Sequence, residues 1–180
     1  MFGIIVVFPN KDNATGIRNL LVRQGIEVKG VCTTGAEALR QAALLDDGII
    51  ICGYKMSDMI FSELREYLSD KIEMLLVASR DKWSSGTADG IMGLTMPIKA
   101  YELISTVNMM MDTIDVRRRK AKKEKKVRND EEKKLINEAK ALLMERNNMT
   151  EEEAHRYLQK GSMNTGKGLV YTAKTILTTS

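Results

Sequence analysis

Two hydrophobic patterns alternate along the N-terminal part of the chain. Short continuous apolar runs, rich in β-branched residues, indicate strands that are buried on both faces of a parallel sheet. Between these runs, apolar residues recur at the spacing of an amphipathic helix. Strands are expected at 2–8, 27–33, 48–52, 74–78 and 90–96, and helices at 14–24, 35–45 and 60–68. Such repeated strand–helix units predict an α/β domain with a doubly wound, parallel five-stranded sheet and helices on both faces.

A long helical pattern follows, with neither Gly nor any further Pro between Lys99 and Gly161. A continuous helix from Lys99 to about Arg146 would be roughly 70 Å long at ~1.5 Å per residue. Its first part carries apolar residues at alternating spacings of four and three, which is the seam of a coiled coil. The seam consists of Leu103, Val107, Met110 and Ile114. We therefore expect a coiled-coil linker over 99–130 and a homodimer through this central helix, with the strongest contact from Leu103 to Val116.

The C-terminal part, 131–180, predicts three helices around one small apolar core. The apolar stripe of the first helix is interrupted at Asn147-Asn148. Thr150 is followed by three glutamates and supplies an N-cap hydroxyl with a carboxylate three positions later, so a second helix begins there. We expect this helix to end at Gly161, since glycine tolerates the left-handed conformation that follows a helix. The inward-facing residues are Leu135, Ile136, Ala139, Leu142, Leu143, Ala154, Tyr157, Leu158, Leu169, Val170, Ala173, Ile176 and Leu177.

The order of residues in this C-terminal part resembles the ANTAR domain of the AmiR/NasR transcription antitermination regulators. The resemblance runs from Lys133 to Leu177 and rests on AK-A-LLMER, on TEEEA-YL, and on Met163 with a basic residue before Leu169. It implies a domain that binds hairpin loops in a nascent leader mRNA and so prevents a terminator from forming. It also implies that a partner protein sequesters the regulator until a small molecule appears.

Candidate RNA-binding residues follow from this resemblance and from the chemistry of RNA loops. Cationic side chains neutralise the phosphates that flank a loop, and polar side chains hydrogen-bond its unstacked bases. Four of the cations align with basic positions of the family, whereas Thr165 and Gly168 stand where the family is often basic. Tyr171 is a further candidate for stacking on a base, and Tyr157 is expected in the core. The candidates are Lys133, Ala139, Lys140, Arg146, Lys160, Asn164, Thr165 and Lys167, with Ala139 permitting close approach of the RNA.

Residues 1–105 resemble a response-regulator receiver domain, on GIIICGYKMSDM and GLTMPIKAYEL. The resemblance implies a phosphoacceptor aspartate at the end of the third strand and an acidic pair after the first strand that binds Mg²⁺. It further implies a hydroxyl residue after the fourth strand and a lysine before the proline that follows the fifth. The residues at these places are Gly53, Phe8 with Pro9, Ala78 or Ser79, and Met96. The segment 80–90 is also too short for the usual fourth helix and is expected to be a loop.

This set of residues predicts a pseudo-receiver that is kept for protein contacts. Phosphoryl transfer to aspartate requires a carboxylate nucleophile and a cation that neutralises the transferred oxygens, and neither is supplied here. We therefore expect no enzymatic activity, no cofactor and no metal. A receiver with a displaced acceptor, Asp12 or Asp58, is the competing interpretation.

The positive charge of the chain is concentrated in one segment. The net charge is +4 and the pI is near 9.0, but nine cations lie between Arg117 and Arg128, outside the predicted bundle. Such a run attracts phosphate without sequence preference.

The two cysteines, Cys32 and Cys52, lie in apolar strand-like runs, so we expect both to be buried as small hydrophobic residues. No segment reaches the ~20 apolar residues of a membrane span, and the N-terminus predicts a strand, so we expect a cytoplasmic protein.

Two other classes of protein share parts of this organisation. A DNA-binding response regulator joins a receiver to a small helical domain, but it needs a basic recognition helix, and the third helix here is poor in Arg and Lys. A protein-interaction module would use the C-terminal bundle to bind a protein and no RNA.

Overall fold

The computed structural model describes residues 1–83 and 91–179. The chain divides into two compact units, Met1–Arg117 and Arg118–Ser180. Helix α4 (Ala100–Asn147) contributes to both units, and its continuity through residues 100–147 confirms the predicted long helix. The N-terminal unit extends beyond residue 105, the limit expected from the sequence, because the first part of α4 joins its core. Within the described ranges, no helix is both long enough and apolar enough to cross a membrane.

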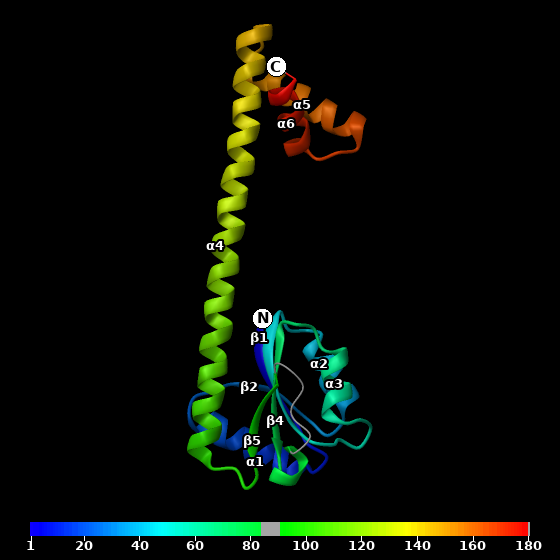
Figure 1. Ribbon diagram of the computed structural model, residues 1–180, viewed down its shortest axis with the longest axis vertical. Coiled ribbons are helices and arrows are strands. Elements are labelled where there is room, and N and C mark those ends of the chain that lie inside the picture. Colours follow the sequence, from blue (N-terminus) through cyan, green and yellow to red (C-terminus); the bar gives the residue numbers. More distant parts are fainter. Residues whose placement is uncertain (84–90, 180) are drawn as a thin grey trace. The chain divides into compact units, whose positions relative to one another are not determined.

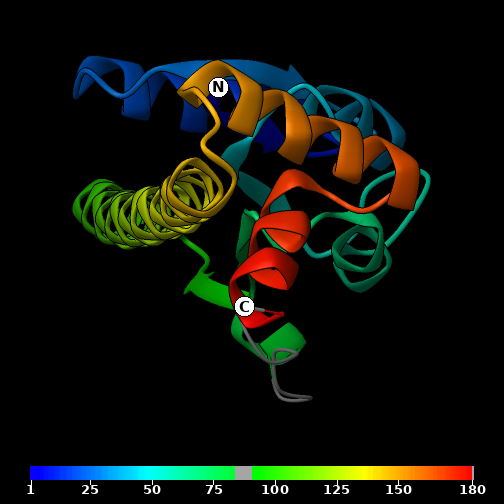
Figure 2. The ribbon, with the colours of Figure 1, turned by 90° about the horizontal axis from the view of Figure 1, so that it is seen from above.

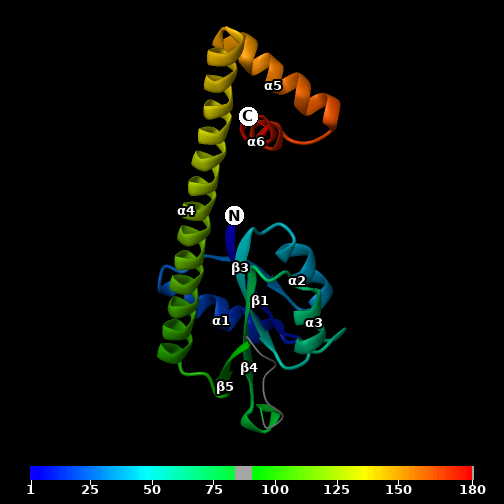
Figure 3. The same cartoon turned by 45° about the horizontal axis from the view of Figure 1, so that its top comes forward.

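The N-terminal unit is built on a parallel sheet with the order β2-β1-β3-β4-β5. The strands and the helices that connect them can be followed in Figures 1 and 3. Its strands are β1 (Phe2–Val7), β2 (Val28–Cys32), β3 (Asp47–Gly53), β4 (Ile72–Ala78) and β5 (Ile91–Thr95). The connecting elements are α1 (Lys11–Arg23), α2 (Gly35–Ala42), α3 (Phe61–Tyr67) and the 3-10 helix η1 (Arg80–Trp83). The predicted doubly wound fold is confirmed. The expected loop at 80–90 begins with η1, and its residues 84–90 lie outside the described residues.

Both faces of the sheet are covered, which explains the continuous apolar runs. Ile4 and Ile49 face one cluster with residues of α1 and α4, whereas Ile5 and Ile50 face the other with residues of α2 and α3. Successive side chains of a strand point to opposite faces, so a strand covered on both sides has no polar position to offer.

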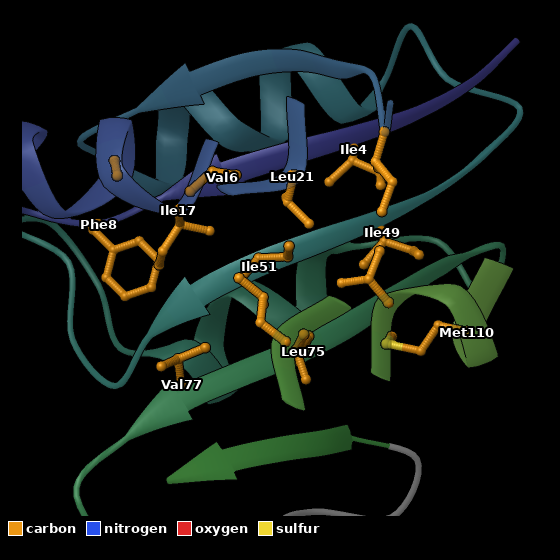
Figure 4. Close-up of a cluster of buried hydrophobic side chains, with 14 of the residues drawn as sticks. Ile4, Val6, Phe8, Ile17, Leu21, Ile49, Ile51, Leu75, Val77 and Met110 are labelled. Carbon is orange, nitrogen blue, oxygen red and sulfur yellow. The ribbon is translucent and has the colours of Figure 1, made fainter. Parts of the chain in front are cut away.

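The apolar seam of the central helix is part of this core, so the prediction that it forms a dimer surface was wrong. Leu103, Val107 and Ile114 are 0% exposed and Met110 is 3% exposed. They pack in the cluster that includes Ile4, Ile49 and Leu75, which Figure 4 shows around Met110. A parallel sheet needs helices on each face, and α4 completes the face that α1 only partly covers. A four-three spacing suits a helix on a sheet as well as a helix on a second helix.

Arg117 marks the end of the packed part of α4. Its guanidinium donates to Glu73 Oε1 at 2.7 Å, to Asp47 Oδ1 at 3.3 Å and to the carbonyl of Lys71 at 3.1 Å. Arg117 therefore belongs to the N-terminal unit rather than to the basic run. From residue 118 to residue 130 every side chain is exposed, as expected for a helix that lies in solvent.

Replacing Arg117 tests whether this contact holds α4 on the sheet. We expect Arg117→Ala to lower the free energy of unfolding of the N-terminal unit by about 1 kcal/mol, because the pair is only partly shielded from water. Chemical denaturation measures the loss. Arg119→Ala, in the exposed run, is the control and should change the free energy by less than about 0.5 kcal/mol. Equal effects of the two substitutions would contradict the assignment.

The C-terminal unit combines the end of α4 with α5 (Glu151–Thr165) and α6 (Leu169–Thr178). Thr150 begins α5 with the predicted capping box: its hydroxyl accepts from the N–H of Glu153 at 3.3 Å, and the Glu153 carboxylate accepts from the N–H of Thr150 at 2.8 Å. Figure 2 shows α6 (red) after the short connection that reverses the chain behind α5 (orange). The shared core consists of Ala139, Leu143, Ala154, Leu158 and Ala173.

Two expectations for this unit were wrong. Helix α5 does not end at Gly161; it continues to Thr165 and ends at Gly166, whose φ of 65° is left-handed. Gly161 has a packing role instead, since a Cβ atom there would lie 2.9 Å from Cγ2 of Thr172 on α6. Tyr157 is not in the core, because its side chain is 50% exposed.

Candidate nucleic-acid interface

In the N-terminal unit, an aromatic ring occupies the space beside the acceptor position. Gly53 ends β3, and a Cβ atom added there would lie 3.1 Å from Cδ1 and 3.3 Å from Cε1 of Phe8. Phe8 is buried in the core, so hydrocarbon fills the place where the resemblance implies a carboxylate. Ala78 lies one residue beyond Val77, the register partner of Gly53, and offers only a methyl group. The exposed Met96 is bound through its N–H to the carbonyl of Ala78.

Asp58, one of the two alternative acceptors, has a structural role. The carboxylate of Asp58 accepts from the N–H groups of Gly35 at 2.8 Å and Ala36 at 2.9 Å, at the start of α2. Burial alone would raise the pKa of Asp58, but these hydrogen bonds outweigh it and hold the pKa below its ordinary value. Asp12, the other alternative acceptor, lies in the first turn of α1. Pro9 lies in the bend that precedes this helix. In residues 1–83 and 91–179, no three His, Cys, Asp or Glu side chains gather as a metal site.

The two cysteines are buried as predicted, and burial controls their chemistry. Desolvation raises the pKa of the Cys32 thiol to about 11 and that of the Cys52 thiol to about 12. Both thiols are therefore protonated at neutral pH. We expect neither to react with a disulfide reagent in the native protein at pH 8, and both to react after denaturation. Rapid labelling of the folded chain would contradict this.

The C-terminal unit contains a groove between α5 and α6, which we call the α5–α6 groove. Four of the predicted RNA-binding residues line it: Lys160, Asn164, Thr165 and Lys167. Two tyrosines line it as well, Tyr157 from α5 and Tyr171 from α6, and their side chains are 50% and 49% exposed. Cationic, amide and aromatic side chains thus meet in one hollow, which is the combination that single-stranded nucleic acid requires.

Contacts inside the groove define the state of its side chains. The ammonium of Lys167 donates to the hydroxyl of Tyr171 at 3.0 Å and lies 4.2 Å from the centroid of its ring. The hydrogen bond and the charge of Lys167 lower the pKa of Tyr171. The Thr165 hydroxyl donates to the carbonyl of Gly161 at 2.9 Å and accepts from the N–H of Lys167 at 3.4 Å. Thr165 therefore shapes the turn, while Asn164 stands exposed at the rim.

The other candidates lie outside the groove. Ala139 is buried in the core of the unit, so the prediction that it permits close approach of RNA was wrong. The Lys140 ammonium binds Glu151 Oε1 at 2.9 Å, its side chain is only 16% exposed, and it holds the pKa of Glu151 below the ordinary value. Lys140 thus joins α4 to α5. Lys133 is exposed on another face, lined by α4 alone, and Arg146 is exposed near the end of α4.

Sequence reasoning missed Tyr157 as a groove residue, although its spacing carried a signal. Tyr157, Lys160 and Asn164 are separated by three and four positions, so they share one stripe of α5. That stripe runs beside the core stripe of Ala154 and Leu158. An aromatic residue that repeats with polar residues, rather than with the core residues, indicates a surface.

The fold of the N-terminal unit is that of receiver domains. A CheY-like receiver protein from Methanospirillum hungatei JF-1 is 12% identical, with a TM-score of 0.54 over 63% of this chain and 97% of its own. The receiver domain of a histidine kinase from Syntrophus aciditrophicus is 23% identical, with a TM-score of 0.52 over 62% and 90%. A structure described as adenylate cyclase from Rhodopirellula baltica is 18% identical, with a TM-score of 0.61 over 68% and 96%. These likenesses show the fold alone.

The C-terminal unit contains the match to a family model. Residues 127–177 match the model of the ANTAR domain, which includes the α5–α6 groove. The chain therefore joins a C-terminal region similar to the ANTAR domain to a receiver-like fold that precedes it in the sequence. No match was found among curated proteins.

Proposed function

We propose that this protein is an RNA-binding transcription antitermination regulator that holds hairpin loops of a leader mRNA in its ANTAR domain. The observation that carries the proposal is the α5–α6 groove, where Lys160, Lys167 and Asn164 lie with two half-exposed tyrosines. Bases in a loop are unstacked and can enter a groove, whereas bases in a duplex cannot. Occupation of the hairpin would then prevent the terminator from forming.

The basic run from Arg118 to Arg128 has a separate part in this proposal. Its side chains are exposed around the whole helix, so they offer positive charge but no pocket that could select a particular RNA. Charge of this kind raises affinity for any phosphate backbone in a salt-dependent way. Selectivity for a loop is left to the groove.

The N-terminal unit acts in this proposal as a pseudo-receiver that binds a regulatory protein in the cytoplasm and catalyses nothing. Its support is the Phe8 ring beside Gly53 and the use of Asp58 as a cap for α2. We still propose a homodimer through the central helix, but through exposed residues of α4 instead of the buried seam. Tyr101, Met109 and Val116 expose apolar side chains on α4, and a second copy of the chain would cover them.

A binding experiment separates this proposal from the DNA-binding and protein-binding alternatives. The full chain is incubated with a pool of hairpin RNAs that share one stem and carry randomised loops, and bound RNA is sequenced. We expect particular loops to be enriched, and a selected hairpin to bind more tightly than its loop-mutated form or duplex DNA at every salt concentration. Helix α6 carries a single cation, Lys174, which disfavours duplex recognition. Equal binding of duplex DNA, or no enrichment, would contradict the proposal.

A further inference from the structure

One face of the Tyr171 ring is covered by a cation that RNA would attract. Lys167 lies in the connection between α5 and α6, and its ammonium sits 4.2 Å from the ring centroid. Both residues are exposed to solvent, so this contact is made on the surface of the groove rather than in the core. An ammonium ion, unlike a packed side chain, leaves such a place readily when a phosphate offers a stronger partner.

The rest of the groove has the features of a pocket for one planar group. Tyr157 lines it from α5, and Tyr171 lines it from α6. Thr172 lies between the helices, where the absence of a side chain at Gly161 lets them approach closely. Thr172 is 9% exposed, and its hydroxyl oxygen has no hydrogen-bond partner in the part of the chain that the structure describes. A buried polar atom without a partner is costly, and its presence beside a groove points to a ligand with polar edges.

We propose that the α5–α6 groove takes one unpaired base of the RNA loop, stacked on Tyr171 in the place that Lys167 occupies in the free protein. The inference deepens the proposed function and rests on it. When the loop arrives, the Lys167 ammonium moves from the ring to the phosphate of the same nucleotide. Asn164, exposed at the rim, hydrogen-bonds the edge of the base.

The exchange is favourable by the strengths of the contacts involved. Loss of one base–aromatic stack lowers affinity by about 5- to 150-fold. A cation over an exposed ring is worth about 2- to 5-fold, and the hydrogen bond from Lys167 to the Tyr171 hydroxyl is given up with it. The cation is not lost in the exchange, because it gains a charged hydrogen bond to phosphate. Lys167 therefore keeps the ring face covered until RNA replaces it.

The test uses the full chain and a selected hairpin with 2-aminopurine at each loop position in turn, since stacking on tyrosine quenches this fluorescent base. We expect quenching at one loop position in the wild type. Tyr171→Phe keeps the ring and should retain the quenching. Tyr171→Leu removes the ring and should abolish the quenching and weaken binding by about tenfold. Tyr67→Leu, at an exposed tyrosine of the N-terminal unit, is the matched control and should change neither.

Further outcomes separate this inference from the proposed function. Lys167→Met should weaken binding but leave the quenching of bound RNA intact, because the ring remains available. If the wild type binds hairpin loops and Tyr171→Leu, folded by circular dichroism, binds and quenches equally, the stacking inference is overturned while the proposed function stands. If the wild type does not distinguish loops at all, the proposed function fails with it.

Discussion

Leu103→Ala is expected to lower the free energy of unfolding of the N-terminal unit by about 3 kcal/mol, whatever the protein concentration. Leu103 is 0% exposed and lies against the sheet, so its loss leaves a cavity in the core. A residue of a dimer seam would act differently, because dissociation makes stability depend on protein concentration. Denaturant unfolding at two concentrations, a hundredfold apart, distinguishes the two roles.

Val127→Ala provides the control for this substitution. Val127 lies on the same helix but is 50% exposed, so its truncation should cost less than about 0.5 kcal/mol. A transition midpoint for Leu103→Ala that rises with protein concentration, more than that of the wild type, would show that the seam joins two chains. The core assignment would then be wrong.

Reversing both groove lysines, Lys160→Glu together with Lys167→Glu, is expected to weaken the binding of a hairpin loop by about a hundredfold or more. Both residues line the α5–α6 groove, so two carboxylates would meet the loop phosphates there. Both are exposed, and the fold should survive the change. Fluorescence anisotropy over a range of salt concentrations measures the loss.

A matched charge reversal in the basic run, Lys123→Glu with Lys126→Glu, separates the contribution of the α5–α6 groove to RNA binding from that of the basic run. These residues are exposed on α4, so the variant should lose affinity for all RNAs alike and show a smaller salt dependence. Its preference for one loop over a mutated loop should remain. If it loses the preference while the groove variant keeps it, the site lies on α4 instead.

The sequence predicted the elements whose signals are local. Continuous apolar runs in the strands, the Thr150 capping box and the unbroken pattern of α4 each depend on near neighbours along the chain. The residues of the receiver positions could also be read one at a time. The structure adds that the Phe8 ring occupies the space beside Gly53, in addition to lacking a carboxylate.

The errors arose where the partner of a residue is distant in the sequence. The seam of Leu103 and Val107 would have the same spacing on a sheet as in a coiled coil. Its partner is the face of the sheet that α1 leaves partly uncovered, and this contact is not visible in the spacing. Gly161 resembles a helix end until Thr172 is placed against it. The ion pair of Lys140 with Glu151 could not be predicted either, because the two residues lie on different helices. In each case a contact across the fold assigned the role.

Photo-crosslinking tests most directly whether the groove holds the loop. A selected hairpin with 4-thiouridine in its loop is irradiated with the full chain, and the crosslinked peptide is identified by mass spectrometry. We predict crosslinks to the peptides of α5 and α6 that carry Tyr157, Lys160 and Tyr171. A hairpin with 4-thiouridine in its stem should give far fewer there. Loop crosslinks confined to residues 118–128, or to the N-terminal unit, would contradict an RNA-binding α5–α6 groove.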